Sequence, residues 1–509
     1  MMHNNDNNNA NNAEVIYHIF QRSFFDSNND KHGDLNGLKE KLDYLQELGI
    51  TSVLLTPLNS SPYYHNYFAD NFETIDPEYG TMEDYFSLVH EVHKRGMKIY
   101  IDMEVQYVTE DHLWFKDSFE NPSSPYSDFV LYKDEENKIP DTIIYDTTGL
   151  LGYDGIYKKI TTVNLLNEAV QQYMYRNFSN WIDPKQDRSF DYGADGFRLD
   201  HMMDMLDGKE KLSNLFSSFW KPLIQSLKRI NPNLVFIAEQ TNWGSYGEEY
   251  IYEVGADRVF AFPLREAILS FNKDEIAIAA ENTFTLTEKQ EHQIVFIENH
   301  DTHRFATAVF RGVGKMRVGA ALNLLLGGTP AIYYGQEIGM KGGGGFGKYG
   351  NSDGNDIPRR EAFKWYKDIN EPGMCLWYEK SGPWWDDSTL TEKDNISLEQ
   401  QINNPSSLWN YYRKLIQLRR QHPALISGIY KTIQNDSGVL FSFTRKTEEE
   451  IILIIINLSG YRQKAIMHIE ADLRENAVQL LFGNEGLIFF TDTANVEISP
   501  YHTAVWKLK

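Results

Sequence analysis

The chain carries a single cysteine, Cys375. One thiol cannot build an intramolecular disulfide framework or a cysteine-based zinc site, so both are excluded. Positive charge is also scarce, because 49 Lys and Arg residues oppose 72 Asp and Glu residues and leave a net charge of −23. Phosphate backbones and anionic membranes are held by basic surfaces, so we expect neither as a partner.

Long apolar runs are missing as well. The strongest one, Ile451 to Leu458, has the length of a strand and is far shorter than the roughly 18 residues that a membrane span needs. We therefore expect no membrane-spanning segment. Residues 1–12 are nearly all Asn and Asp, without the basic and apolar regions of a signal peptide, and this composition predicts a disordered tether.

Aromatic residues, in contrast, are abundant at 14% of the chain. One explanation is a large core, which 509 residues can supply. The other is a sugar-binding cleft, where flat rings stack on the apolar faces of pyranoses.

Short β-branched and aromatic runs alternate with amphipathic helical stretches from Glu14 onward, as in parallel βα units. Eight such runs predict eight strands, and eight parallel strands with intervening helices predict a (β/α)8 barrel. The predicted strands are Val15 to Phe20, Ser52 to Pro57, Lys98 to Glu104, Gly196 to Asp200, Leu234 to Glu239, Arg258 to Pro263, Gln293 to Asn299 and Pro330 to Tyr334.

Two further regions flank this pattern. A polar stretch over residues 105–164 is too long for an ordinary βα loop and predicts an inserted subdomain after the third strand. After the helix Ser407 to Arg420, alternating strands such as Ile451 to Asn457 predict a C-terminal antiparallel β-sandwich over residues 424–509. The barrel would then comprise residues 13–104 and 165–423.

Acidic residues end three of the predicted strands. Asp200 ends the fourth strand, Glu239 ends the fifth, and Asp301 follows the seventh. Catalytic groups of such barrels lie at the carboxyl ends of the strands, so these three carboxylates should meet in one cleft. A carboxylate pair of this kind suits glycoside hydrolysis, in which one group attacks the anomeric carbon and the other protonates the leaving oxygen.

A metal-dependent hydrolase or lyase is the main competitor, since carboxylates and histidine also bind Mg²⁺ or Zn²⁺. Against it, the cluster offers only His300, and no HxxH or HxH spacing ends a strand.

Three strings resemble signature regions of the α-amylase family of glycoside hydrolases: GFRLD at 196–200, IAEQ at 237–240 and ENHDTHR at 298–304. The likeness extends over almost the whole chain and includes YHIFQRSF near the start and GTPAIYYGQEIGM after residue 326. The resemblance implies a retaining hydrolase of α-1,4 linkages in starch-like α-glucans or maltooligosaccharides. Some such enzymes also transglycosylate.

By this resemblance Asp200 would be the nucleophile and Glu239 the general acid/base. Asp301 would be the third carboxylate, which grips sugar hydroxyls at the cleavage point. Arg198 and His300 would orient the nucleophile and hold the same sugar.

The resemblance also implies further substrate contacts. Tyr67 falls where the family has a tyrosine stacked beneath the sugar, and Tyr107 falls where it has a sugar-binding His. Members that trim terminal glucose tend to have Asp directly after that tyrosine, paired with the Arg that matches Arg304. Here that position is Phe68, which favours a cleft open at both ends and internal cleavage.

Two departures bear on calcium. Gln106 stands where the family has a calcium-ligating Asn, and Thr161 to Asn164 replace a segment that carries a ligating Asp. We therefore expect the usual calcium between barrel and subdomain to be absent. A second family site in the first loop looks complete, with oxygen ligands at alternate positions as hard cations require. Its predicted ligands are Asp26, Asn28, Asp30, the carbonyl of His32 and Asp34.

Alternative functions remain open at this point. They are an α-glucosidase, a transglycosylase or a disaccharide-active relative, and a carbohydrate-binding relative with weakened catalysis. We expect a monomer. Since polymeric glucan is met outside the cytoplasm, we expect an extracellular or periplasmic protein, with a lipid tether or a cytoplasmic location as alternatives.

Overall fold

The computed structural model describes residues 13–345, 347–386, 396–468, 478–490 and 493–509. The predicted tether at residues 1–12 lies outside the described residues. No helix in the described ranges is long and apolar enough to cross a membrane.

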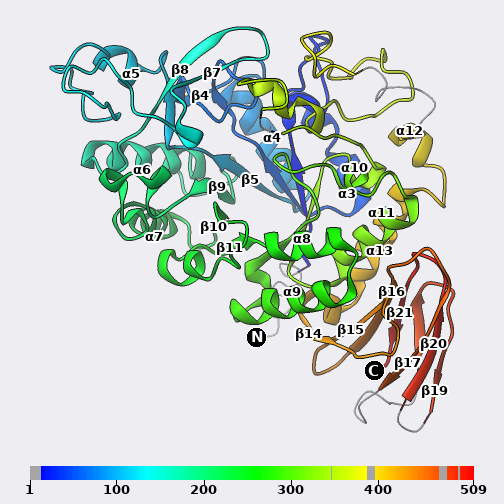
Figure 1. Cartoon of the computed structure of the whole chain (residues 1–509). Coiled ribbons are helices and arrows are strands. Elements are labelled where there is room, and N and C mark those ends of the chain that lie inside the picture. The colour runs from blue at the N-terminus through cyan, green and yellow to red at the C-terminus, as the bar shows by residue number, and fades with distance from the viewer. Residues whose placement is uncertain (1–12, 346, 387–395, 469–477, 491–492) are drawn as a thin grey trace.

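A closed barrel forms the centre of the molecule (Figure 1). Within the described residues it has eight strands, all paired in parallel, in the order β1-β13-β12-β11-β10-β9-β5-β2. This confirms the predicted (β/α)8 fold. The strands are β1 (Ile16–Ile19), β2 (Ser52–Leu55), β5 (Lys98–Met103), β9 (Gly196–Met202), β10 (Val235–Gln240), β11 (Arg258–Phe260), β12 (Gln293–Val295) and β13 (Thr329–Tyr333).

Several strands are shorter than predicted, and the two largest differences, in β11 and β12, have identifiable reasons. β11 ends at Phe260 because α8 (Phe262–Ser270) begins there with a proline in its first turn, where the missing N–H costs no hydrogen bond. β12 ends at Val295, before a turn held by side chains: Asn299 N–H donates to Thr302 Oγ1 (2.9 Å), and Asp301 N–H donates to Asn299 Oδ1 (3.0 Å). Such local bonds compete with the strand ladder.

Helices surround the barrel. Several begin at side-chain caps, as in α4, where Thr81 and Asp84 form a capping box. The helices that connect and cover the barrel strands are α2 (Leu35–Glu40), α3 (Leu42–Leu48), α4 (Met82–Lys94), α6 (Glu168–Ile182), α7 (Lys221–Ile230), α8, α9 (Lys273–Leu286), α10 (Phe305–Ala308), α11 (Val313–Leu325), α12 (Leu398–Gln401) and α13 (Leu408–Gln421).

The barrel interior is packed with apolar side chains that alternate along the strands. They include Ile16, Leu54, Tyr100, Ile237, Phe260 and Ile294. Gly196 is required where β9 meets β10, because a Cβ there would lie only 2.0 Å from the Val235 carbonyl oxygen. This tight pairing supports the strand that carries Asp200.

The segment between β5 and α6 forms a small sheet beside the barrel, drawn in cyan in Figure 1. Its strand order is β6-β8-β7, and the helix α5 (Leu113–Ser118) lies between β6 and β7 in the chain. The strands are β6 (Tyr107–Thr109), β7 (Gly149–Leu151) and β8 (Tyr157–Thr162).

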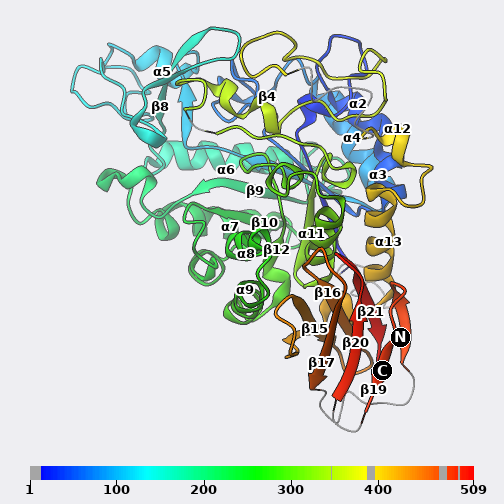
Figure 2. The ribbon, with the colours of Figure 1, turned by 45° about the vertical axis from the view of Figure 1, so that its right-hand side comes forward.

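The C-terminal region consists of antiparallel sheets that lie beside α11 and α13 (Figure 2). The short helix α14 (Pro423–Ser427) leads into it, and Arg445 joins it to the barrel by donating from Nη1 to the Leu326 carbonyl (2.6 Å). Apolar residues of both sheets share a core. One sheet has the order β14-β15-β16-β21-β18 and the other β17-β20-β19: β14 (Ile429–Thr432), β15 (Leu440–Lys446), β16 (Ile451–Asn457), β17 (Gln463–His468), β18 (Gln479–Phe482), β19 (Leu487–Phe489), β20 (Thr493–Ile498) and β21 (Thr503–Lys507).

Candidate active site

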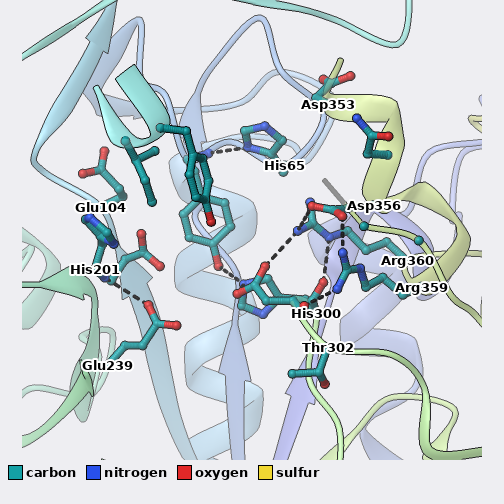
Figure 3. A pocket seen from close by; sticks show the side chains of 18 of the residues that line it. His65, Glu104, His201, Glu239, His300, Thr302, Asp353, Asp356, Arg359 and Arg360 are labelled. Carbon is teal, nitrogen blue, oxygen red and sulfur yellow. Dashed lines mark hydrogen bonds and ion pairs between the residues drawn. The ribbon is translucent and has the colours of Figure 1, made fainter. Parts of the chain in front are cut away.

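A pocket of about 760 Å³ opens at the carboxyl ends of the barrel strands. The three predicted carboxylates line it together with several of the predicted substrate contacts, as Figure 3 shows in part. The predicted residues in its lining are Tyr67, Phe68, Tyr107, Asp200, Glu239, His300 and Asp301. Two predicted contacts, Arg198 and Arg304, are fully buried and do not line it.

Arg198 contacts three carboxylates. It lies two residues before Asp200 on β9, so both side chains point to the same side of the strand. Its Nη1 contacts Asp200 and lies 2.6 Å from Asp102 Oδ2, while its Nη2 lies 2.9 Å from Glu239 Oε2. One planar guanidinium therefore orients the nucleophile candidate and the acid candidate together.

The two central carboxyls differ in protonation. Burial, together with the charges of Asp200 and Asp301, raises the pKa of Glu239 to about 7 against the lowering effect of Arg198. Burial also raises the pKa of Asp200, to about 6, against the lowering effect of Arg198. Near neutral pH, Asp200 can be ionised while Glu239 holds a proton, which is the division of roles between a nucleophile and a general acid.

Asp301, in contrast to Asp200 and Glu239, has a lowered pKa and is ionised. Burial by itself would raise its pKa, but His300 and then Arg360 and Arg198 hold the pKa well below the usual range. His300 Nε2 lies 2.9 Å from Asp301 Oδ2, and Arg360 Nη2 lies 3.0 Å from Oδ1. Asp301 is thus a fixed anion that can accept bonds from sugar hydroxyls.

Tyr67 is part of the same network. Its hydroxyl donates to Asp102 Oδ2 (2.7 Å) and lies 2.7 Å from His300 Nε2. The rings of Tyr67 and His300 are nearly parallel, at 14°. The tyrosine is therefore rigid before any ligand arrives.

Phe68 and Tyr107 form one wall of the pocket. Their rings make an edge contact with centroids 6.0 Å apart. The Tyr107 hydroxyl donates to Asp207 Oδ2 (2.8 Å), so it is already engaged within the protein.

Arg304 has a structural role, because its contacts are with other protein groups. Its Nη1 lies 3.0 Å from Glu298 Oε1 and donates to the Tyr334 carbonyl, while its Nε donates to the Arg359 carbonyl (3.1 Å). Because the side chain is fully buried and outside the pocket lining, it has no direct path to a sugar in this structure.

Gln106 lies between β5 and β6 and contacts the carboxyl end of β9. Its Nε2 donates to the main-chain carbonyls of Asp200 (2.7 Å) and His201 (2.9 Å). A neutral side-chain amide here joins the segment that follows β5 to the end of β9.

The five predicted calcium ligands lie in one loop, residues 26–34, and their oxygen donors suit a hard cation. Asp26 accepts N–H groups of its own loop, including that of Asn29 (2.7 Å), and Asp34 accepts the Ser27 N–H (2.9 Å). The described part of the chain holds no cluster of three or more His, Cys, Asp or Glu residues arranged for a metal. The calcium stays a prediction.

The sequence reasoning missed several residues of the site. Asp102 begins the altered first signature region and was not assigned a role, and Arg360 comes from the loop after β13, far from Asp301 in sequence. His201 directly follows Asp200, and that adjacency was the available signal. Trp243 lines the pocket from the loop after β10 and stacks on Phe262 at 7°.

Comparison with known proteins gives a consistent result. The family model described as "Alpha amylase, catalytic domain" matches residues 18–428. Alpha-amylase 3 of Dictyoglomus thermophilum is 28% identical over 505 residues, covering 97% of this chain and 93% of that protein. An oligo-1,6-glucosidase of Parageobacillus thermoglucosidasius is 25% identical over 567 residues, covering 97% of this chain and 98% of that protein.

Among solved structures, that of an α-amylase from H. orenii superposes with a TM-score of 0.79 at 26% identity. The match covers 97% of this chain and 99% of that one.

Proposed function

Because the chain belongs to the α-amylase family of glycoside hydrolases, we propose that it is a retaining enzyme that cleaves α-1,4-glucosidic bonds inside starch-like α-glucans or maltooligosaccharides. The observation that carries the proposal is the pair of carboxyls on one guanidinium, with Asp200 and Glu239 both facing the pocket.

In the first step of the proposed reaction, Asp200 attacks the anomeric carbon and Glu239 gives its proton to the leaving oxygen. A covalent glycosyl-enzyme forms. In the second step Glu239, now ionised, takes a proton from water, and the resulting hydroxide attacks the anomeric carbon and frees Asp200. The unequal pKa values of the two groups support these roles. Asp301, anionic at all working pH values, would bind hydroxyls of the reacting sugar.

Internal cleavage is supported by the wall of the pocket. Phe68 follows Tyr67 where a carboxylate would be needed to close the end of the cleft, and the Arg304 guanidinium is taken by Glu298. The same argument predicts that longer chains can extend past the cleavage point in both directions.

A second candidate is an α-glucosidase or transglycosylase, including one active on disaccharides. The observation that favours it is the likeness to an oligo-1,6-glucosidase over 97% of this chain. It shares all catalytic residues with the first candidate and differs only in substrate and acceptor.

Two predictions accompany the proposed function. We propose a calcium ion in the loop of residues 26–34, supported by its oxygen-rich ligand set. We also propose that the protein works outside the cytoplasm, where polymeric glucan is met.

Chromatography of products from amylose, pullulan, maltotriose and sucrose tests the function. Internal cleavage should release a mixture of maltooligosaccharides from long amylose at early times. Glucose as the sole early product would rule out internal cleavage and favour the second candidate, and disaccharide products from sucrose would favour a transglycosylase.

A further inference from the structure

His201 follows Asp200 directly in β9 and lines the pocket between Glu104 and Glu239 (Figure 3). Its main-chain N–H donates to Glu239 Oε2 (3.0 Å), and its main-chain carbonyl accepts from Gln106 Nε2 (2.9 Å). It therefore touches the acid candidate directly and adjoins the nucleophile candidate covalently.

The imidazole of His201 is held by a carboxylate. Its Nε2 lies 3.0 Å from Asp207 Oδ1, while Asp207 Oδ2 accepts from the Tyr107 hydroxyl (2.8 Å) and from Lys209 Nζ (3.1 Å). With both oxygens engaged, Asp207 is fixed beside the ring. A carboxylate bonded to one ring nitrogen sets the orientation of the ring and favours the imidazolium form.

The backbone at His201 is unusual, with φ at 44°. A residue with a Cβ rarely adopts this left-handed conformation, and such outliers persist where the surroundings hold them in place. Here Gln106 holds the carbonyl, Glu239 holds the N–H and Asp207 holds the side chain. Three separate elements thus converge to keep this ring in one position.

Asp200 needs positively charged neighbours if it is to stay ionised in its buried position. Burial raises its pKa, and the nearby carboxylates Asp102 and Asp301 raise it further, whereas Arg198 and His201 lower it. Burial disfavours the charged form of His201, but the bond to Asp207 and the charges of Asp200 and Glu239 raise its pKa. The titratable and charged groups around this pair are Tyr67, Asp102, Glu104, Tyr107, Arg198, Asp207, Lys209, Glu239 and Asp301.

We propose that His201, oriented by its bond to Asp207, is a positioning residue that keeps Asp200 ionised by placing a second positive charge beside it, in addition to that of Arg198. This inference deepens the proposed function and rests on it. Arg198 pairs with three carboxylates, so its single positive charge does not balance all three. The imidazolium of His201 adds a second positive charge that stabilises the ionised form of Asp200.

The test is the pH profile of kcat/KM with maltooligosaccharides for wild type, H201Q, D207N and the double variant. H201Q removes the positive charge beside Asp200, so the pKa of Asp200 should rise. The acidic limb of the H201Q profile should therefore move upward by about one pH unit. D207N should move it in the same direction, and the double variant should match H201Q, because Asp207 acts through His201. H303Q is the matched control: His303 lines the same pocket, and the described residues show no bond from it to Asp200 or Glu239, so its acidic limb should keep the wild-type position.

An active H201Q variant with an unmoved acidic limb would overturn the inference, as would additive shifts in the double variant. NMR titration of ¹³C-labelled histidine gives a readout that needs no activity: the pKa of His201 should lie above that of a free histidine and should fall in D207N. If wild type cleaves none of the α-glucan substrates, the proposed function is lost. The histidine titration then decides the inference separately, since a His201 pKa at or below the free value would refute it.

Discussion

Gln106 and Asp200 are joined by a 2.7 Å hydrogen bond from the Gln106 side-chain amide to the Asp200 main-chain carbonyl. A second bond, of 2.9 Å, runs from the same nitrogen to the His201 carbonyl. The strand end that presents the nucleophile candidate is thus fixed by the segment between β5 and β6, where Gln106 is almost fully buried.

Replacing Gln106 tests this contact. Q106L leaves two carbonyls without their donor, so we expect a loss of about 1–3 kcal/mol in the free energy of unfolding. A small displacement of Asp200 should also lower kcat, by about tenfold or more, with less effect on KM. Urea unfolding and steady-state kinetics measure both. A Q106L variant with wild-type kcat would show that Asp200 is positioned without this bond.

The carboxylates can be tested by isosteric amides. D200N and E239Q should each lower kcat by orders of magnitude, because the covalent step needs a carboxylate and the leaving group needs an acid. Both variants should unfold close to the wild-type temperature. D43N, on an exposed carboxylate that pairs with Arg95, is the control and should keep its activity. Near-normal turnover in D200N or E239Q would refute the assignment.

Activity should depend on pH in a narrow bell. Asp200, with its pKa raised to about 6, must be ionised, so kcat/KM should fall as the pH drops through about 6. Glu239, with its pKa raised to about 7, must be protonated, so kcat/KM should fall as the pH rises through about 7. Since these groups interact, the two limbs report the cluster as a whole. A profile that stays flat from pH 5 to pH 9 would contradict this arrangement.

Arg304 and Glu298 form a buried pair whose loss should affect stability. R304M leaves the Glu298 carboxylate buried without its cation, at a cost of about 3–5 kcal/mol. The double variant E298Q/R304M should lose less than the sum of the single variants, as a double-mutant cycle would measure. If R304M kept its stability and only raised KM, Arg304 would be a substrate contact after all.

Calcium in the loop of residues 26–34 predicts stabilisation by mass action, of about 2.7 kcal/mol at a calcium concentration 100 times the Kd. Chelation should therefore lower the unfolding temperature at a fixed scan rate, and added calcium should restore it. D26N should remove this difference, while D43N should retain it. An unfolding temperature that does not change in excess chelator would rule out the ion.

Much of the site follows from short-range pattern. Arg198 and Asp200 are two residues apart in a strand, so they must share a face, and strand ends in a parallel barrel must meet at one rim. The partners that come from distant loops do not follow in this way. Arg360 reaches Asp301 from 59 positions away, and its contact depends on how the loop after β13 folds over the barrel.

The sequence by itself determined the order of the strands, the barrel they form and the three carboxylates at its rim, because periodicity and motif spacing are local properties. Only the tertiary structure decided the chemical state of those groups. Burial and the charges of Arg198, His201, His300 and Arg360 set which carboxyl holds a proton, and these depend on distances between segments that are remote in the chain. For the same reason only the structure placed Arg304 in the scaffold and His201 beside the nucleophile.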